Sequence, residues 1–224
     1  LLGPSSGMAV NVPPGGETQT GERPATATAA RRALHVTKMF TWAGTDCLRL
    51  EGARVVLGER GLRAMGSVVS AAQDGVEAYT ASYSLTTDEV GVVQRLTVRI
   101  ARATGERHVI LTRSEEGIWL VDHGQGAERT NFGGVLDVDL ALSPLFNALP
   151  IRRLGLYRDA ALHDLPVVFV ALPSLEVCRV SQTYRTVSLG DPGVVSISSD
   201  TWNVEITVDA DGMVLEYPGL ASRV

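Results

Sequence analysis

Hydrophobic and polar residues alternate over most of the chain after residue 39, and this alternation restricts the fold more than any other feature. Leu96, Val98 and Ile100 alternate with arginine and threonine, and the segments 136–140 and 202–208 follow the same pattern. Successive side chains of a β-strand point to opposite faces of the sheet, so a period of two indicates strands with one buried face. The segment 166–173, PVVFVALP, is apolar throughout and predicts a strand covered on both faces.

Turn sequences separate the predicted strands at intervals of about ten residues, which is typical of a β-meander. They are TGE at 104–106, GQG at 124–126, GDPG at 190–193 and DADG at 209–212, the last a predicted hairpin loop. A helix of one or two turns is expected in SPLFNAL, 143–149, with Ser143 as N-cap and Pro144 in the first turn.

These patterns predict an all-β protein with little helix, built on one large antiparallel, many-stranded, β-barrel-like sheet. Closure into a barrel is favoured because it removes exposed strand edges.

The first 36 residues differ from the rest of the chain. They are rich in Gly, Pro, Ser, Thr and Ala, and the first aromatic residue is Phe40. A segment of this composition buries too little apolar surface to offset its ordering entropy, so we expect a flexible tail over 1–36 and a β domain over 37–224. A short helix from Ala25 to Val36 is weakly favoured by composition and opposed by its threonines.

The composition argues against several classes of function. The formal net charge is −5 and no basic block occurs, so no nucleic-acid partner is predicted. No apolar run approaches the roughly 20 residues of a transmembrane helix, and no signal-peptide pattern is present, so we expect a cytoplasmic protein. The two cysteines, Cys47 and Cys178, are expected to be buried reduced thiols rather than a disulfide.

No motif of catalytic chemistry stands out in the sequence. It contains no G-x-S-x-G nucleophile elbow, no H-E-x-x-H zinc motif and no glycine-rich phosphate loop before a helix. The four histidines are scattered along the chain. We therefore predict no catalytic residue, metal or cofactor.

Two adjacent arginines inside the apolar segment NALPIRRLGL, 147–156, are the most unusual feature. If the segment is a strand, Arg152 shares a face with Leu154 and Leu156 and points inward, whereas Arg153 points to the opposite face. A bulge after Pro150 would exchange the two faces. A buried arginine needs a carboxylate, carbonyls or a polar ligand, and its planar fork suits phosphate, carboxylate or sugar hydroxyls.

Asp137 and Asp139 have the spacing that places both carboxylates on one face of a strand. A solvated outer face is the favoured interpretation. The alternatives are an ion pair with one of the arginines, for which Arg153 is the better candidate, or a metal site or acid–base pair.

Further polar and aromatic residues have weaker patterns. Gln182 and Tyr184 share a strand face, which is expected to be the wet end of a core. Trp42, Trp119 and Trp202 are far apart in sequence and are expected to be separate strand anchors rather than a sugar-stacking platform.

Four segments resemble the putative glycolipid-binding family of bacterial proteins. They are TWAGTDCLRLE (41–51), FGGVLDVDLALSPLFNALPIRRLGL (132–156), PSLEVCRVSQTY (173–184) and WNVEITVDADGMVLEYPGLASR (202–223). The resemblance implies a β-barrel-like sheet around a hydrophobic core with helical material, similar to lipoprotein-localisation carriers, and a role in binding a glycolipid. The polar residues it implicates are Asp137, Asp139, Asn147, Arg152, Arg153, Gln182, Tyr184, Asp209, Tyr217 and Arg223.

The leading hypothesis is non-catalytic binding of an amphipathic lipid or glycolipid, with its acyl chain in an apolar β cup. The expected head-group contacts are Asp137, Asp139, Asn147, Arg152, Arg153, Gln182, Tyr184 and Tyr217. Two alternatives are open: an enzyme on a lipid or sugar-phosphate substrate that uses Asp137 and Asp139 with an arginine clamp, and a structural barrel without a ligand. A homodimer also remains open.

Overall fold

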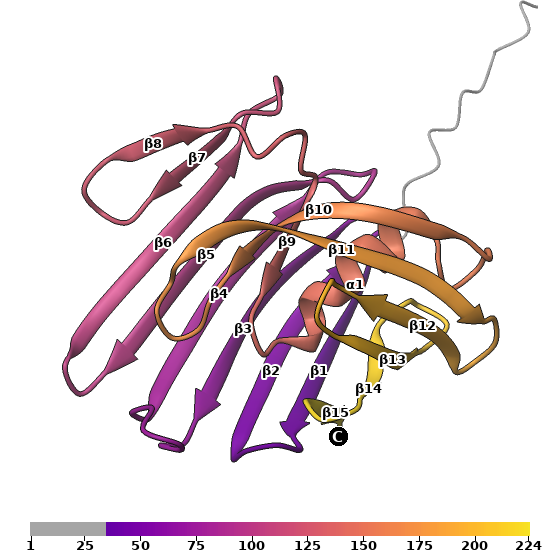
Figure 1. Ribbon diagram of the computed structural model, residues 1–224, viewed down its shortest axis with the longest axis horizontal. Coiled ribbons are helices and arrows are strands. Elements are labelled where there is room, and N and C mark those ends of the chain that lie inside the picture. Colours follow the sequence, from indigo (N-terminus) through magenta and orange to yellow (C-terminus); the bar gives the residue numbers. More distant parts are fainter. Residues whose placement is uncertain (1–34) are drawn as a thin grey trace, which may run out of the picture. The chain divides into compact units, whose positions relative to one another are not determined.

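The computed structural model describes residues 35–224, which form one 15-stranded sheet and one helix (Figure 1). The strands of the first half are β1 (Val36–Gly44), β2 (Arg49–Leu57), β3 (Leu62–Ser70), β4 (Tyr79–Thr87), β5 (Val93–Arg102), β6 (Gly105–Arg113), β7 (Trp119–Asp122) and β8 (Ala127–Thr130). After them come β9 (Asp137–Leu140), the helix α1 (Pro144–Leu154), β10 (Leu162–Val170), β11 (Val177–Ser188), β12 (Gly193–Ser198), β13 (Asn203–Val208), β14 (Val214–Tyr217) and β15 (Ala221–Arg223).

The sheet is a meander in which nearly every strand pairs antiparallel with its neighbour in sequence. Its order is β8-β7-β6-β5-β4-β3-β2-β1-β15-β14-β13-β12-β11-β10-β9, so β1 and β15 join the two halves at its centre. Only β9 and β10 are parallel, because the connection between them crosses over through α1. The predicted antiparallel, many-stranded architecture is confirmed.

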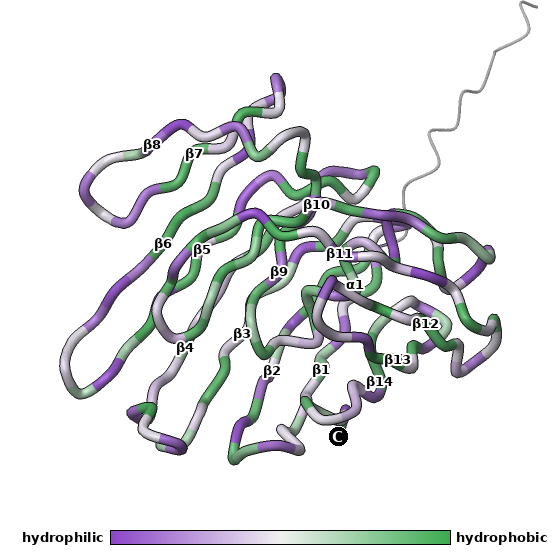
Figure 2. The backbone as a smooth tube through the Cα atoms, in the orientation of Figure 1, coloured by the Kyte–Doolittle hydropathy of each residue, from purple (hydrophilic) through white to green (hydrophobic). Residues whose placement is uncertain are grey.

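The alternation that predicted the strands follows from one buried and one exposed face. Along β2 the burial pattern repeats every two residues, with Ala53, Val55 and Leu57 buried. Figure 2 shows hydrophobic and hydrophilic stretches alternating along the long strands β3–β6.

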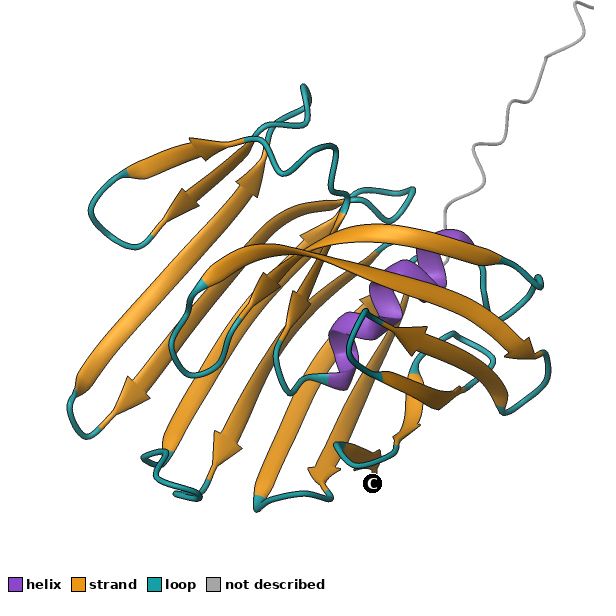
Figure 3. Cartoon of the chain, viewed as in Figure 1, coloured by secondary structure: helices purple, strands orange, loops and turns teal. Residues whose placement is uncertain are grey.

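The helix lies against one face of the curled sheet, between the first half of the strands and the strands β10–β12 that cross in front of them (Figure 3). Two core clusters result. The larger joins the inner face of β1–β7 to β9, β10 and the first turns of α1, including Leu145, Phe146 and Leu149. The smaller joins Ile151 near the end of α1 to β11–β14. On β10, Val168 and Val170 enter the larger cluster while Val167 is buried on the other face, so this strand is covered on both sides, as predicted.

Closure into a barrel, which the sequence favoured, is wrong. The sheet stays open, with β8 and β9 at its two edges. Each edge strand has four residues, and short edges are one of the ways in which proteins limit edge-to-edge association. The helix fills the concave side of the sheet with side chains.

The strand expected over 147–156 is also wrong, because residues 144–154 form α1. Pro144 lies in the first turn, and Gly155 ends the helix in the left-handed conformation, with φ of 71°. The predicted short helix is therefore real but longer than expected. Every residue from 144 to 152 is buried, so no polar face marks the helical period, and a helix that is buried all round looks like an apolar run.

Other expectations have mixed outcomes. DADG joins β13 to β14 as a hairpin loop. Both cysteines are free thiols, but Cys178 is exposed and Cys47 only half-buried, which contradicts the expectation that they are buried. Most of the predicted tail, 1–36, and the weak helix at 25–36 lie outside the described residues.

Candidate functional site

Arg153 on α1 binds Asp137 on β9 through its Nε and Nη2 atoms, and the shortest distance, from Nη2 to Oδ2, is 2.5 Å. The Asp137 side chain is 1% exposed. Burial raises the pKa of Asp137, while Arg153 opposes that shift. The pair anticipated between Arg153 and an aspartate is confirmed, although it forms from a helix and not a strand. A solvated outer face for Asp137 is wrong.

Arg152 points inward, as predicted, and is 3% exposed. Its guanidinium donates to the carbonyl oxygens of Asp211 and Gly58, the latter at 2.7 Å. It therefore ties α1 to the β2–β3 turn and to the β13–β14 hairpin. Burial lowers the pKa of Arg152, because the charged form loses hydration.

A second polar chain begins at Asp139, two residues along β9. Gln182 Nε2 donates to Asp139 Oδ2 at 2.8 Å, and the Tyr184 hydroxyl donates to Gln182 Oε1 at 3.1 Å. Asn147 Nδ2 on α1 donates to the Tyr184 oxygen at 3.3 Å. Burial raises the pKa of Asp139, with Gln182 opposing the shift. The shared face of Gln182 and Tyr184 is confirmed, and it holds a connected hydrogen-bond network.

A pocket of about 460 Å³ opens beside this network. This volume lies within the range of roughly 300–1,000 Å³ that is usual for small-molecule sites. It lies where β9, the start of α1, β10, β11 and the loops around β13–β15 meet. Its lining consists of Asp139, Leu140, Ala141, Leu142, Ser143, Asn147, Phe169, Val180, Ser181, Gln182, Ser199, Thr201, Trp202, Tyr217 and Leu220.

Four of the residues that the sequence singled out line this pocket: Asp139, Asn147, Gln182 and Tyr217. The other four do not. Tyr184 is a buried member of the network that does not reach the pocket, and Asp137, Arg152 and Arg153 are engaged in the contacts between α1 and the sheet.

Trp202 also lines the pocket, although the sequence predicted a strand anchor there. It precedes β13 instead of lying on a strand, and it is 40% exposed. Trp42 and Trp119, by contrast, are buried and donate their indole N–H groups to Val214 and Val135 carbonyls, as strand anchors do. The turn-like sequence SDT at 199–201, just before Trp202, was the signal that could have placed it in a loop.

The pocket offers polar atoms that the fold leaves free. Within residues 35–224, no hydrogen bond uses Asp139 Oδ1, Asn147 Oδ1 or the Tyr217 hydroxyl. Burial and the nearby Asp139 raise the pKa of Tyr217 to about 12, so its hydroxyl is protonated at neutral pH. No lysine, arginine or histidine is among the lining residues, and Asp139 is the one acidic group.

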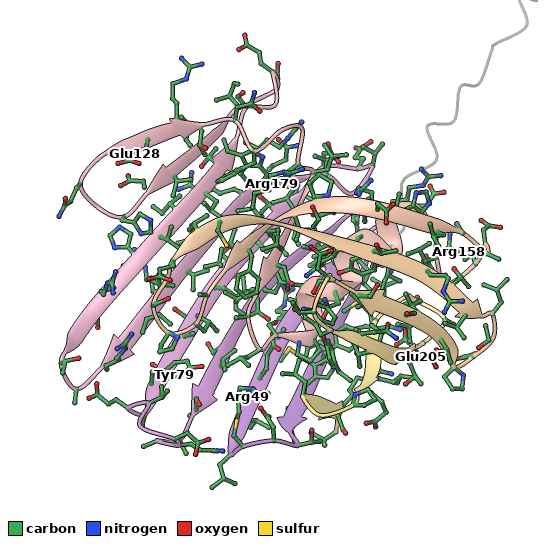
Figure 4. The ribbon with its side chains drawn as sticks, in the orientation of Figure 1. Arg49, Tyr79, Glu128, Arg158, Arg179 and Glu205 are labelled. Atoms are coloured by element: carbon green, nitrogen blue, oxygen red, sulfur yellow. The ribbon has the colours of Figure 1, made fainter. Side chains whose placement is uncertain are left out.

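A buried carboxylate, Glu51, lies behind the pocket wall and was also missed. Tyr83 and Ser143 both donate their hydroxyls to its Oε1 at 2.6 Å, while Oε2 has no partner within the described part of the chain. Burial raises its pKa to about 7, against the lowering effects of Ser143, Tyr83 and Arg49. Arg49 is the first residue of β2, two residues before Glu51, and is labelled in the lower part of Figure 4. The available signal was the period of two along 49–57, because Glu51 shares its strand face with Ala53 and Val55 and therefore points inward.

Residues 35–224 contain no group of three or more His, Cys, Asp or Glu side chains placed to hold a metal ion. The helix α1 is neither long nor apolar enough to cross a membrane.

The curled sheet around one buried helix, with a polar and aromatic pocket at its rim, defines a class of single-sheet β proteins with a small-molecule-sized pocket. The chain belongs to the family described as putative glycolipid-binding, whose model matches residues 39–223. Membership in this family supports a binding role.

A similar solved structure is that of a DUF1089 family protein from Pseudomonas aeruginosa. It is 26% identical, with a TM-score of 0.66, and the match covers 79% of this chain and 92% of that one. None of the curated proteins compared with the chain matches it.

Proposed function

We propose that the protein binds, without converting it, an amphipathic lipid whose neutral, hydroxyl-rich head group occupies the pocket at Asp139. The observation that carries this proposal is the lining itself: free hydrogen-bonding atoms and three aromatic residues around a carboxylate, with no cation. The family to which the chain belongs is consistent with a sugar head group.

The polar atoms of the pocket suit sugar hydroxyls. A hydroxyl both donates and accepts, so it can donate to Asp139 Oδ1 or Asn147 Oδ1 and accept from the Tyr217 hydroxyl. An apolar ligand that covered these acceptors would leave them unpaired at a cost of about 1–3 kcal/mol each, which gives a hydroxyl-bearing ligand an advantage over an apolar one. Trp202 presents a half-exposed aromatic surface on which the C–H face of a sugar ring can pack.

The same lining disfavours an anionic head group. A phosphate would approach the Asp139 carboxylate with no guanidinium or ammonium group in the pocket to offset the repulsion. Arg152 and Arg153, which the sequence suggested as a clamp, are already bound to protein oxygens. For the apolar part of the ligand, Leu140, Phe169 and Leu220 offer surface along the pocket wall.

The geometry supports the enzymatic alternative less well. General acid–base catalysis by Asp137 and Asp139 needs both carboxylates to reach one substrate. Asp137 is held by Arg153 and does not line the pocket, so only Asp139 can contact a ligand there.

The test is a titration of the delipidated protein with a monomeric alkyl glucoside, followed by tryptophan fluorescence. We expect saturable binding with a fluorescence change, because Trp202 is half-exposed at the pocket whereas Trp42 and Trp119 are buried. The Trp202→Leu variant is expected to lose most of the signal and part of the affinity. An alkyl phosphate with the same chain is expected to bind more weakly.

Asp139→Asn is the matched variant for the head-group preference. It keeps the side-chain shape and removes the charge, so we expect the difference between glucoside and phosphate to shrink. Mass spectrometry of organic extracts of the purified protein gives an independent measurement of the bound lipid. No saturable binding of either probe, together with extracts free of lipid, contradicts the proposal.

A further inference from the structure

The face of the sheet opposite to α1 is an exposed surface formed by the first five strands. We call it the outer face and define it by the side chains that point away from the core on β1–β5. They are Thr37, Met39, Thr41, Ala43, Leu50, Gly52, Arg54, Val56, Arg63, Met65, Ser67, Val69, Thr80, Ser82, Ser84, Thr86, Arg95, Thr97, Arg99 and Ala101. Figure 1 shows α1 and β9–β12 lying over the other face of these strands.

The charge of the outer face is opposite in sign to that of the whole protein. The formal net charge of the chain is −5, yet the outer face carries four arginines and no aspartate or glutamate. These arginines are exposed, and none forms an ion pair with another residue of 35–224. The outer face is therefore a positively charged patch, bordered on β6 by Glu106, which lies across from Ala101.

Apolar side chains stand among these charges. Met39 and Met65 are 68% and 65% exposed, and both lie directly across from Arg54, on β1 and β3 respectively. Leu50 and Val69, also exposed, are a cross-strand pair further along the same strands. Flexible methionines that flank a guanidinium can enter the apolar boundary of a bilayer while the guanidinium binds a phosphate.

A dent of about 390 Å³ lies in the middle of the outer face, between Arg54 and Arg99. Gly52, which has no side chain on this face, leaves it open, and it is also lined by Gly66 and Tyr83, whose Cβ positions point toward the core. Its remaining wall is made of Met39 and Met65 and of the hydroxyl-bearing residues Ser67, Ser82, Ser84 and Thr97. Two guanidinium groups and a ring of hydroxyl donors are what a phosphate group requires.

Packing requires a glycine at only one of the two glycine positions that line the dent. A Cβ at Gly66 would lie 2.3 Å from the Tyr83 hydroxyl, so the packing of Tyr83 requires that glycine. A Cβ at Gly52 would meet no atom within 4 Å, so nothing in the fold requires glycine there. The hollow at Gly52 is therefore unexplained by packing.

From the charge, the exposed methionines and the dent together, we propose that the outer face docks on the surface of a membrane that contains anionic phospholipids, with one lipid phosphate in the dent. This inference goes beyond the pocket at Asp139, from which the outer face is separated by the sheet. Two other occupants fit less well. The outer face has no outward aromatic side chain for stacking on nucleic-acid bases, and two copies meeting face to face would oppose like charges.

The experiment measures binding of the full chain to vesicles by co-sedimentation. One set of vesicles is phosphatidylcholine alone, and the other is equal parts phosphatidylcholine and phosphatidylglycerol. We expect binding to the second set only, and loss of that binding at high salt. The double variant Arg54→Ser, Arg99→Ser is expected to bind about 25-fold more weakly, since each basic residue near an anionic surface contributes about a factor of five.

A second double variant, Met39→Ser, Met65→Ser, keeps every charge and removes the apolar contacts. It is expected to weaken vesicle binding as well. The control changes Arg179 and Arg185 to serine, because both are exposed on β11, outside the outer face, and neither forms an ion pair in the described chain (Figure 4 labels Arg179). It should bind vesicles as the wild type does. A Trp202→Ser variant, altered in the pocket, should do the same.

Three results would overturn the proposal. One is equal binding, or none, to the two kinds of vesicle. Another is equal loss in the β11 control, which would indicate a nonspecific charge effect. The third is tight binding of a single-stranded oligonucleotide that depends on Arg54 and Arg99 but not on the methionines, which would assign the face to nucleic acid.

Discussion

Glu51 is a buried acid with two hydroxyl donors on one oxygen and, within residues 35–224, none on the other. Its folded-state pKa of about 7 lies above the ordinary value of 4.5. Between these two values the folded protein holds a proton that the unfolded chain has released. The free energy of unfolding therefore falls as the pH rises from about 4.5 to about 7, and changes little from this source outside that window.

We predict that Glu51→Gln removes this pH dependence. The difference in unfolding free energy between wild type and variant should change by about 3 kcal/mol from pH 4.5 to pH 8, in favour of the variant at the higher pH. Urea denaturation at the two pH values measures it. Because the comparison is with the variant, the contributions of Asp137 and Asp139 cancel. A difference that is the same at both pH values would show that folding does not raise the pKa of Glu51.

The Arg153–Asp137 pair has a larger expected effect than an exposed pair, because Asp137 is almost completely buried. We predict that Arg153→Met lowers the free energy of unfolding by about 3–5 kcal/mol at neutral pH, since it leaves a buried carboxylate without its cation. Adding Asp137→Asn to this variant should restore part of the loss, because the remaining side chain is neutral. Chemical denaturation of the three proteins tests this, and a loss below 1 kcal/mol for Arg153→Met would contradict it.

At the scale of elements, the end of α1 is fixed by the backbone conformation of one glycine and by two backbone hydrogen bonds. Gly155 is left-handed, and its N–H bonds to the Arg152 carbonyl at the end of the helix. The following residue, Leu156, donates its N–H to Ile151, which completes the cap. Arg152 and Arg153 lie in the last turn before this cap and bind different partners: Arg152 binds two backbone carbonyls and Arg153 binds Asp137.

Two glycine substitutions should have opposite effects on stability. We predict that Gly155→Ala costs about 1 kcal/mol, because its φ of 71° is unfavourable for an L-residue although the nearest atom to the new Cβ is 3.9 Å away. Gly52→Thr should stabilise the protein by up to about 1 kcal/mol, since β2 is regular there and the space is open. Thermal unfolding compares both with the wild type; a loss in both would mean that β2 needs its glycine.

For the whole molecule, the sheet and both core clusters are assembled from residues 36 onward. We predict that a chain beginning at Ala33 unfolds at the same temperature as the full chain, within about 2 °C, because it keeps every core side chain of the described residues. Differential scanning calorimetry of the two chains provides the comparison. A clearly lower melting temperature would show that the preceding residues contribute to the fold.

The sequence alone predicted the class of the fold and the resemblance to the family, because both depend on local patterns. Period-two burial along β2–β6 and β13, and the turns between them, are properties of neighbouring residues. The inward direction of Arg152 and the pairing of Arg153 with Asp137 were also predicted, but from a strand that does not exist. They came out correctly because two adjacent residues point different ways on a helix as well, about 100° apart instead of 180°.

Only the tertiary structure decided which of these residues share a site. Residues of α1 are buried on every side, so whether 147–156 is helix or strand depended on what packs around it. The pocket gathers Asp139, Gln182, Trp202 and Tyr217 from segments up to 78 positions apart (139 to 217), and no sequence period relates them. The open edges and the charge of the outer face likewise follow from how the strands pair and curl, because burial and electrostatic neighbours are properties of the assembled sheet.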